Sequence, residues 1–144
     1  MIEVPSANNQ IVCVGRFELF SAAELFDHFV QPELLKYWWP EQAVTDPQVG
    51  GKYNFTWPDM NWELHGEYTA FEPAKHLGFT WNWSHEPQFQ PLQVDIYFSD
   101  IVEGCRLGLF HGPFIEQDAA QRQGVVEGWI HFGMRLAGLR RVEE

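Results

Sequence analysis

The stretch DAAQRQGVVEGWIHFGMRLAGLRR, residues 118–141, decides the fold. At about 100° per residue, its large apolar side chains fall within an arc of about 80° on one side of a helix. They are Val125, Trp129, Phe132, Leu136 and Leu139. The spacing predicts a long amphipathic helix over 118–141, and we expect the first four of these side chains to face a sheet.

The same helix carries glycine at four positions, which are Gly124, Gly128, Gly133 and Gly138. Each glycine costs a helix about 1 kcal/mol relative to alanine. A glycine inside a helix therefore indicates either the close approach of another chain segment or open space beside the helix.

Segments rich in β-branched and aromatic residues, most of them with period-2 alternation, precede this helix and predict strands. They are residues 10–19, 52–57, 62–71, 77–83, 92–98 and 106–111. Short turns between the later segments favour antiparallel hairpins. Ser21 and Glu24 have capping-box spacing, and Pro32 suits the first turn of a second short helix. The sequence thus predicts an α+β fold with two short helices after the first strand.

The order of these pieces resembles the START-like, or Bet v 1-like, helix-grip superfamily. More narrowly, it resembles the AHSA1-like proteins, which are related to the activator of Hsp90 ATPase. The pieces are SAAELFD at 21–27, PELLKYWWP at 32–40, GGKY at 50–53, GEY at 66–68, FEP at 71–73, LGFTW at 77–81, RL at 106–107, HG at 111–112 and GW at 128–129.

This resemblance implies one domain over residues 1–144. It implies a curved antiparallel sheet wrapped around the long C-terminal helix, with a cavity between them. Members of the family include co-chaperone domains, binders of hydrophobic ligands and polyketide cyclases. Because one fold carries several activities, the resemblance alone does not assign one of them.

Charge and composition exclude several classes of partner. Nine basic and twenty acidic residues give a formal net charge of −11, which repels nucleic acid and anionic membranes. No apolar run reaches the length of about 18 residues that a membrane span needs. Cys13 and Cys105 lack metal or redox spacing, and the N-terminus lacks the pattern of a signal peptide. We therefore expect a cytoplasmic protein.

Side chains of shared strand parity, together with the apolar face of the last helix, predict a ligand pocket. The expected ligand-binding residues are Tyr53, Phe55, Trp57, Tyr68, Phe79, Trp81, Val94, Ile96, Leu109, His111, Trp129 and Phe132. The tryptophans either form an aromatic wall for a flat apolar ligand or fill the interior. Those concerned are Trp39, Trp57, Trp62, Trp81, Trp83 and Trp129.

His111 is the sharpest candidate for chemistry, because its parity with Leu107 and Leu109 aims it at the cavity. It suits a structural role, a polar contact to a ligand, or acid–base catalysis. No motif for a cofactor is present, and Gly50-Gly51 lacks a phosphate-binding context. Glu127 and His131 are four residues apart, but two such side chains do not make a zinc site. We expect neither metal nor cofactor.

Three functions remain open at this point. The first is non-catalytic binding of a small hydrophobic or aromatic molecule. The second, implied by the resemblance, is stimulation of an Hsp90-type chaperone. The third is an enzyme of cyclase or dehydratase type, with His111 as acid or base and Tyr53 or Tyr68 assisting. Tyr97 and Phe110 point away from the cavity and suit a homodimer contact.

Overall fold

The computed structural model describes residues 1–7, 9–115 and 119–140. In chain order the elements are β1 (Ile2–Val4), β2 (Ile11–Glu18), α1 (Ala22–Val30), α2 (Pro32–Leu35), β3 (Gln42–Thr45), β4 (Lys52–Trp57), the 3₁₀ turn η1 (Pro58–Met60), β5 (Trp62–Glu72), β6 (His76–Trp83), β7 (Leu92–Ile101), β8 (Gly104–Gly112) and α3 (Ala119–Gly138).

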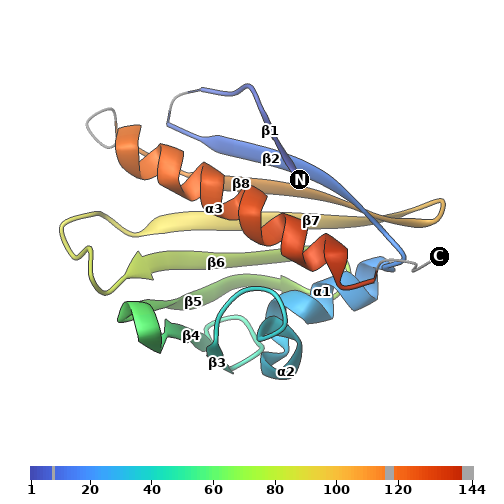
Figure 1. Ribbon diagram of the computed structural model, residues 1–144, viewed down its shortest axis with the longest axis horizontal. Helices are drawn as coiled ribbons and strands as arrows, with labels where there is room; N and C mark the ends of the chain where they lie inside the picture. Colours follow the sequence, from blue (N-terminus) through green and yellow to red (C-terminus); the bar gives the residue numbers. More distant parts are fainter. Residues whose placement is uncertain (8, 116–118, 141–144) are drawn as a thin grey trace.

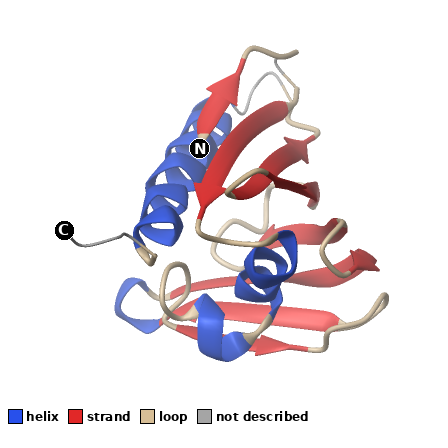
Figure 2. Cartoon of the chain, turned by 90° about the vertical axis from the view of Figure 1, so that its right-hand side faces the viewer, coloured by secondary structure: helices blue, strands red, loops and turns tan. Residues whose placement is uncertain are grey.

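The described strands form one eight-stranded sheet in the order β1-β2-β8-β7-β6-β5-β4-β3. Every neighbouring pair is antiparallel. Helix α3 crosses one face of the sheet diagonally (Figure 1). The sheet bends between its two halves, and α1 and α3 lie on the inner side of the bend (Figure 2). The helix-grip arrangement expected from the sequence is confirmed.

Two strands escaped the sequence analysis, and both are short edge strands. β1 has three residues and β3 has four, so neither is long enough to show a clear alternation. β1 pairs with β2, and β3 pairs with β4, which places these two strands at opposite ends of the sheet. The other strands lie where the alternation placed them, within a few residues.

The start of α1 follows the predicted capping box. The Ser21 hydroxyl accepts a hydrogen bond of 3.1 Å from the backbone N–H of Glu24. In return, the Glu24 carboxylate accepts one of 3.1 Å from the backbone N–H of Ser21. Helix α2 begins at Pro32, whose fixed φ suits a first helical position. Two short helices therefore follow β2, as expected.

Helix α3 is present, but its buried face differs from the predicted one. The predicted ends, Asp118 and Arg141, lie outside the described residues. The buried positions are Val126, Trp129, Gly133 and Leu136. At about 100° per residue, this face is rotated by about 50° from the expected one. Leu139, at one edge of the apolar arc, is 38% exposed. Val125 and Phe132 are partly buried and border a cavity instead of packing on the sheet.

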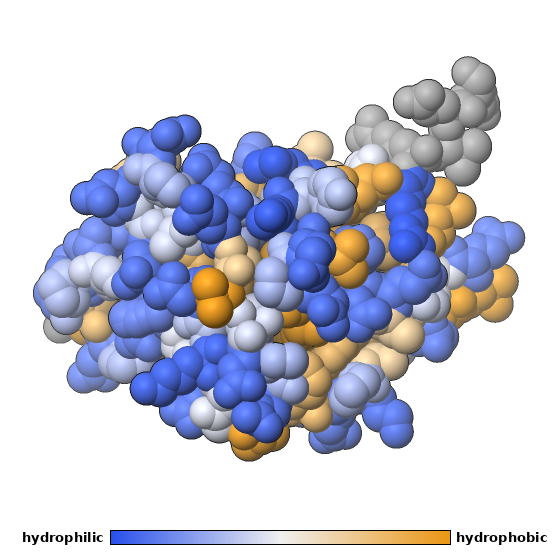
Figure 3. Space-filling view, turned by 90° about the horizontal axis from the view of Figure 1, so that it is seen from below, coloured by the Kyte–Doolittle hydropathy of each residue, from blue (hydrophilic) through white to orange (hydrophobic). Residues whose placement is uncertain are grey.

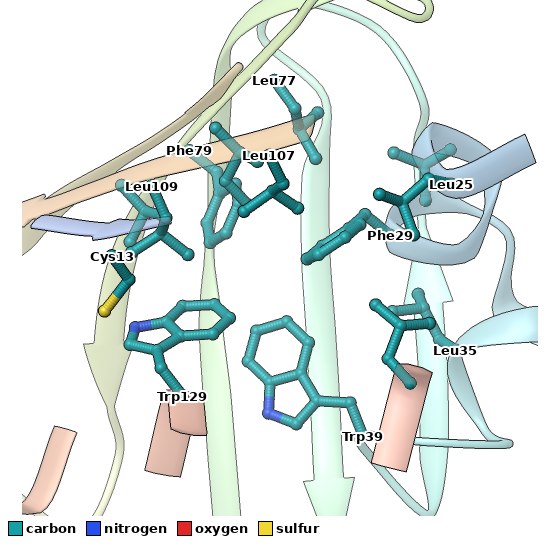
Figure 4. Packing of buried hydrophobic residues seen from close by; sticks show 14 of the residues in the cluster. Cys13, Leu25, Phe29, Leu35, Trp39, Leu77, Phe79, Leu107, Leu109 and Trp129 are labelled. Carbon is teal, nitrogen blue, oxygen red and sulfur yellow. The ribbon is translucent and has the colours of Figure 1, made fainter. Parts of the chain in front are cut away.

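The core lies between the inner face of the sheet and the three helices. Trp39 and Trp129 lie beside each other there, with Phe79, Leu107 and Leu109 next to them (Figure 4). Phe29 of α1 and Leu35 from α2 close the other side (Figure 4). The helix-side aromatic residues thus meet the strand-side ones directly, and they set the inner wall of the site described below.

The molecular surface is mainly polar on the face seen in Figure 3, where apolar side chains form small separate groups. This agrees with the large excess of acidic over basic residues. Within the described ranges, no helix is both long and apolar enough to cross a membrane.

Candidate functional site

A cavity of about 690 Å³ lies between α3 and the strands β4 to β6. Its aromatic lining comprises Trp39, Trp57, Trp62, Trp81, Trp83, Phe89, Trp129 and Phe132. Its remaining lining residues are His85, Glu86, Ala120, Gln121, Gly124, Val125, Glu127, Gly128 and His131. We call this space the tryptophan cavity. Its volume falls within the range of about 300–1,000 Å³ that is typical of small-molecule sites.

Strand pairing brings four of the cavity tryptophans together. Trp57 at the end of β4 lies opposite Trp62 at the start of β5, and Trp83 of β6 lies opposite Leu64. Trp81 precedes Trp83 by two residues, so the two share one face of β6. Their indole centroids are 5.6 Å apart, and those of Trp57 and Trp83 are 5.4 Å apart. The alternation of β6 thus builds one wall of the cavity.

Trp39 joins the strands to the helix. Its carbonyl oxygen accepts a hydrogen bond of 3.1 Å from the indole N–H of Trp57. Its ring stacks on Trp81 with centroids 5.9 Å apart and lies 5.1 Å from the ring of Trp129. These four indoles are all at least nine-tenths buried, so they form the floor. The rings are held by packing and hydrogen bonds, which presents a fixed aromatic surface to the cavity.

Two glycines form the helix side of the cavity. A Cβ atom added at Gly124 or at Gly128 would meet no atom within 4 Å, whereas one at Gly133 would lie 3.1 Å from the Met1 side chain. The first two glycines therefore face open space, and the third marks a close contact. The sequence left both explanations of a helical glycine open. Open space accounts for Gly124 and Gly128, and the close approach of another segment accounts for Gly133.

The cavity has a polar rim. Glu127 and His131 of α3 are exposed there, and Gln121 is partly exposed. Across from them lies the loop between β6 and β7, where the His85 ring approaches the Glu86 carboxylate at 3.4 Å. His85 also stacks on Trp62 with centroids 5.6 Å apart. An apolar floor with a polar rim suits a ligand that enters from solvent and buries one flat face.

His111 lies behind the floor and not in the lining. Its side chain is completely buried, and its Nδ1 accepts a hydrogen bond of 2.9 Å from the indole N–H of Trp129. The proton of the neutral ring therefore lies on Nε2. Burial lowers the pKa of His111 to about 3, because desolvation disfavours the charged imidazolium.

Two buried N–H groups near the floor have no hydrogen-bond partner among the described residues. They are Nε1 of Trp81 and Nε2 of His111, and the two rings lie edge to face with centroids 4.6 Å apart. Trp81 lines the cavity, whereas His111 does not. An unpaired buried donor costs about 1–3 kcal/mol of stability.

The structure separates the predicted ligand-binding residues into two groups. Trp57, Trp81, Trp129 and Phe132 border the tryptophan cavity. The others lie in the packed core: Tyr53, Phe55, Tyr68, Phe79, Val94, Ile96, Leu109 and His111. Four of them, Tyr53, Phe55, Tyr68 and Phe79, surround a gap with no room for a water molecule. The burial of the eight core residues is observed. Ligand contact by any of the twelve predicted residues stays a prediction.

The acid–base alternative finds little support in this geometry. The hydroxyl of Tyr53 donates to the backbone oxygen of Thr80, and burial raises its pKa well above the usual value. Burial likewise raises the pKa of Tyr68. Neither tyrosine lines the tryptophan cavity. A catalytic pair would need two titratable groups converging on one bound atom, and these three side chains do not converge there.

The six tryptophans that the sequence offered as one possible wall all border this cavity. Three of them, Trp39, Trp62 and Trp83, are not among the predicted ligand-binding residues, and neither are the loop residues. Phe89 gave one usable signal, because it is a lone aromatic residue between Pro87 and Pro91.

Among the described residues, no group of three or more His, Cys, Asp or Glu side chains is placed to hold a metal ion.

Comparison with known proteins agrees with this architecture. Residues 20–140 match the family model described as activator of Hsp90 ATPase homolog 1-like protein. The solved structure of MLL2253 from Mesorhizobium loti is 26% identical, with a TM-score of 0.81 over 90% of this chain and 95% of that one. No functionally curated protein matches the chain.

Two further solved structures share the fold at lower identity. Ms6760 from Mycobacterium smegmatis is 16% identical, with a TM-score of 0.81 over 100% of this chain and 98% of that one. CV1439 from Chromobacterium violaceum is 19% identical, with a TM-score of 0.76 over 94% of this chain and 99% of that one. At these identities the likeness supports the fold alone.

Proposed function

Because the chain belongs to the activator of Hsp90 ATPase homolog 1-like family, whose fold is typical of small ligand-binding domains, we propose that it binds a flat aromatic small molecule without catalysing a reaction. The ligand occupies the tryptophan cavity. The observation that carries this proposal is the open space of about 690 Å³ beside Gly124 and Gly128, facing buried indoles. A packed core would leave no such space.

The arrangement of groups favours a ligand with one flat face. The indole rings that border the cavity offer area for a planar ring system. His111 supports the site indirectly, since it accepts the hydrogen bond from Trp129 and so holds that indole in place.

An uncharged fluorescent aromatic probe tests this proposal. We expect a Kd near the micromolar range, which is about −8 kcal/mol, and a change in tryptophan emission. Gly128→Phe should abolish binding, because the new ring would project into the cavity. Gly108→Phe is the matched control, since its Cβ also meets no atom within 4 Å but Gly108 does not line the cavity. Equal binding to all three proteins would overturn the proposal.

Stimulation of an Hsp90-type ATPase is a second candidate, and family membership is the observation that favours it. The test is the ATPase rate of a purified Hsp90-type chaperone with and without an excess of this chain. Gly128→Phe separates the two functions, because a filled cavity should remove probe binding but leave an outer docking surface unchanged.

We also propose that the protein resides in the cytoplasm and that it forms a homodimer. Cys13 and Cys105 are free and buried, as expected in a reducing compartment. Tyr97 and Phe110 are partly exposed on the outer sheet face, with ring centroids 5.9 Å apart. Cell fractionation tests the cytoplasmic location. Sedimentation of the wild type and of Tyr97→Glu tests the homodimer.

A further inference from the structure

We propose that the tryptophan cavity selects a planar aromatic cation over neutral and anionic molecules of the same shape. This inference rests on the proposed function, and it adds the charge of the ligand. It follows from three features of the cavity: its aromatic faces, its carboxylates and the placement of the neighbouring basic residues.

The first feature is the density of indole rings. Six tryptophans border one cavity. The face of an aromatic ring carries partial negative charge, and tryptophan attracts cations more strongly than tyrosine or phenylalanine does. The rings form one connected group, because Trp81 lies 5.6 Å from both Trp83 and Trp129, centroid to centroid. A cation in this space would therefore lie beside several indole rings at once.

The second feature is the sign of the charged lining residues. Glu127 of α3 and Glu86 of the loop between β6 and β7 supply carboxylates. Among the described residues, no lysine or arginine borders the cavity. The chain as a whole carries a formal charge of −11, which adds a field of the same sign. An anionic ligand would meet these carboxylates and no lysine or arginine, so we expect it to be repelled.

The third feature is that the arginine side chains in and just after α3 lie outside the cavity lining. The Arg122 guanidinium bonds to the Glu3 carboxylate and to the Gln10 carbonyl. Arg140, which follows the end of α3, bonds to the Glu24 carboxylate. Arg135 lies over the ring of Phe132, 5.8 Å from its centroid, but does not line the cavity. The helix therefore presents Glu127 and His131, and no arginine, to the cavity.

Weak hydration makes an organic cation the best match. A metal ion or a primary ammonium loses strong hydration when it enters an apolar site, and this loss is costly without several oxygen ligands. A quaternary or delocalised cation loses less, and aromatic cages bind such groups. The rim carboxylates then supply long-range attraction without being buried beside the ligand.

Three probes with one ring system test the charge preference: N-methylacridinium, neutral acridine and the anion acridine-9-carboxylate. Their binding is followed by fluorescence at mildly alkaline pH and low salt. We expect the cation to bind about ten-fold more tightly than acridine, which corresponds to about 1.4 kcal/mol. The anion should bind most weakly. Added salt should reduce the preference, because the carboxylates at the rim are partly solvated.

Variants locate the source of the preference. The double variant Glu86→Gln/Glu127→Gln should lose most of it while still binding acridine. Glu33→Gln/Glu72→Gln is the matched control, because both residues are exposed and lie outside the cavity lining. The two control substitutions remove the same amount of negative charge. The control should keep the preference, because screening over about 10 Å weakens distant charges.

The outcomes separate this inference from the proposed function. If acridine and N-methylacridinium bind the wild type equally, and Gly128→Phe abolishes both, the cavity binds ligands but the charge preference is overturned. If the control double variant loses the preference as fully as Glu86→Gln/Glu127→Gln does, net charge and not the rim is responsible, which also overturns it. If no probe binds the wild type, both proposals fail.

Discussion

The indole N–H of Trp129 donates a hydrogen bond of 2.9 Å to Nδ1 of His111, and both side chains are buried. This bond joins the last helix to the last strand beneath the floor of the tryptophan cavity. It also indicates a positioning role for His111. By accepting this hydrogen bond, the imidazole holds the indole of Trp129 in place in the floor.

Removing the acceptor should cost stability. In His111→Leu, the buried N–H of Trp129 loses its partner, and we expect a loss of about 1–3 kcal/mol in the free energy of unfolding. Urea denaturation of His111→Leu, Trp129→Phe and the double variant forms a double-mutant cycle. The coupling energy should be about 1 kcal/mol or more, whereas additive effects would show that the bond contributes little.

The stability of the wild type should fall in acid partly through His111. Burial lowers its pKa from the ordinary 6.5 to about 3. Between these values the unfolded chain takes up a proton that the folded chain refuses, so unfolding becomes easier as the pH falls. The effect is about 1.4 kcal/mol per pH unit.

His111→Phe isolates this contribution, because the variant lacks the titrating ring. Relative to the wild type, the variant should gain about 1.4 kcal/mol per pH unit as the pH falls from about 6.5 towards 5. Urea denaturation at several pH values measures the difference. A constant difference across this range would show that the ring titrates normally in the folded protein.

Trp129 should be among the most sensitive positions of α3. It is 3% exposed and packs against the rings of Trp39 and Trp81. Trp129→Ala should reduce the free energy of unfolding by about 3–5 kcal/mol. Met134→Ala on the same helix is the control, because Met134 is 63% exposed and should change stability by less than about 0.5 kcal/mol. Similar losses at both positions would contradict the buried face described for α3.

The glycines beside the cavity should be replaceable without loss of stability. Gly124→Ala and Gly128→Ala should each stabilise the protein by about 0.5–1 kcal/mol, because alanine favours the helix and its Cβ meets no atom within 4 Å. Gly133→Ala should gain less, or lose stability, since its Cβ would press on Met1 at 3.1 Å. Thermal unfolding of the three variants gives the order. A larger gain at Gly133 would contradict this assignment.

The sequence by itself determined the two short helices, the six longer strands and the faces on which most strand side chains lie. Alternation along β6 aimed Trp81 and Trp83 at one face, and Ser21 with Glu24 fixed the start of α1. These features depend on neighbours a few residues away, so a local pattern is sufficient to predict them. The resemblance to the helix-grip superfamily then supplied the order of the layers.

Only the tertiary structure decided which inward-facing residues border open space. Tyr53 and Trp57 share one face of β4, yet Tyr53 lies in the packed core and Trp57 borders the cavity. The difference arises because Phe29 of α1 and the ring of Trp39 fill the space beside Tyr53, whereas Gly124 and Gly128 of α3 leave space near Trp57. Strand parity fixes the face on which a side chain lies. What covers that face depends on where segments distant in the sequence cross it, and no local pattern carries that information.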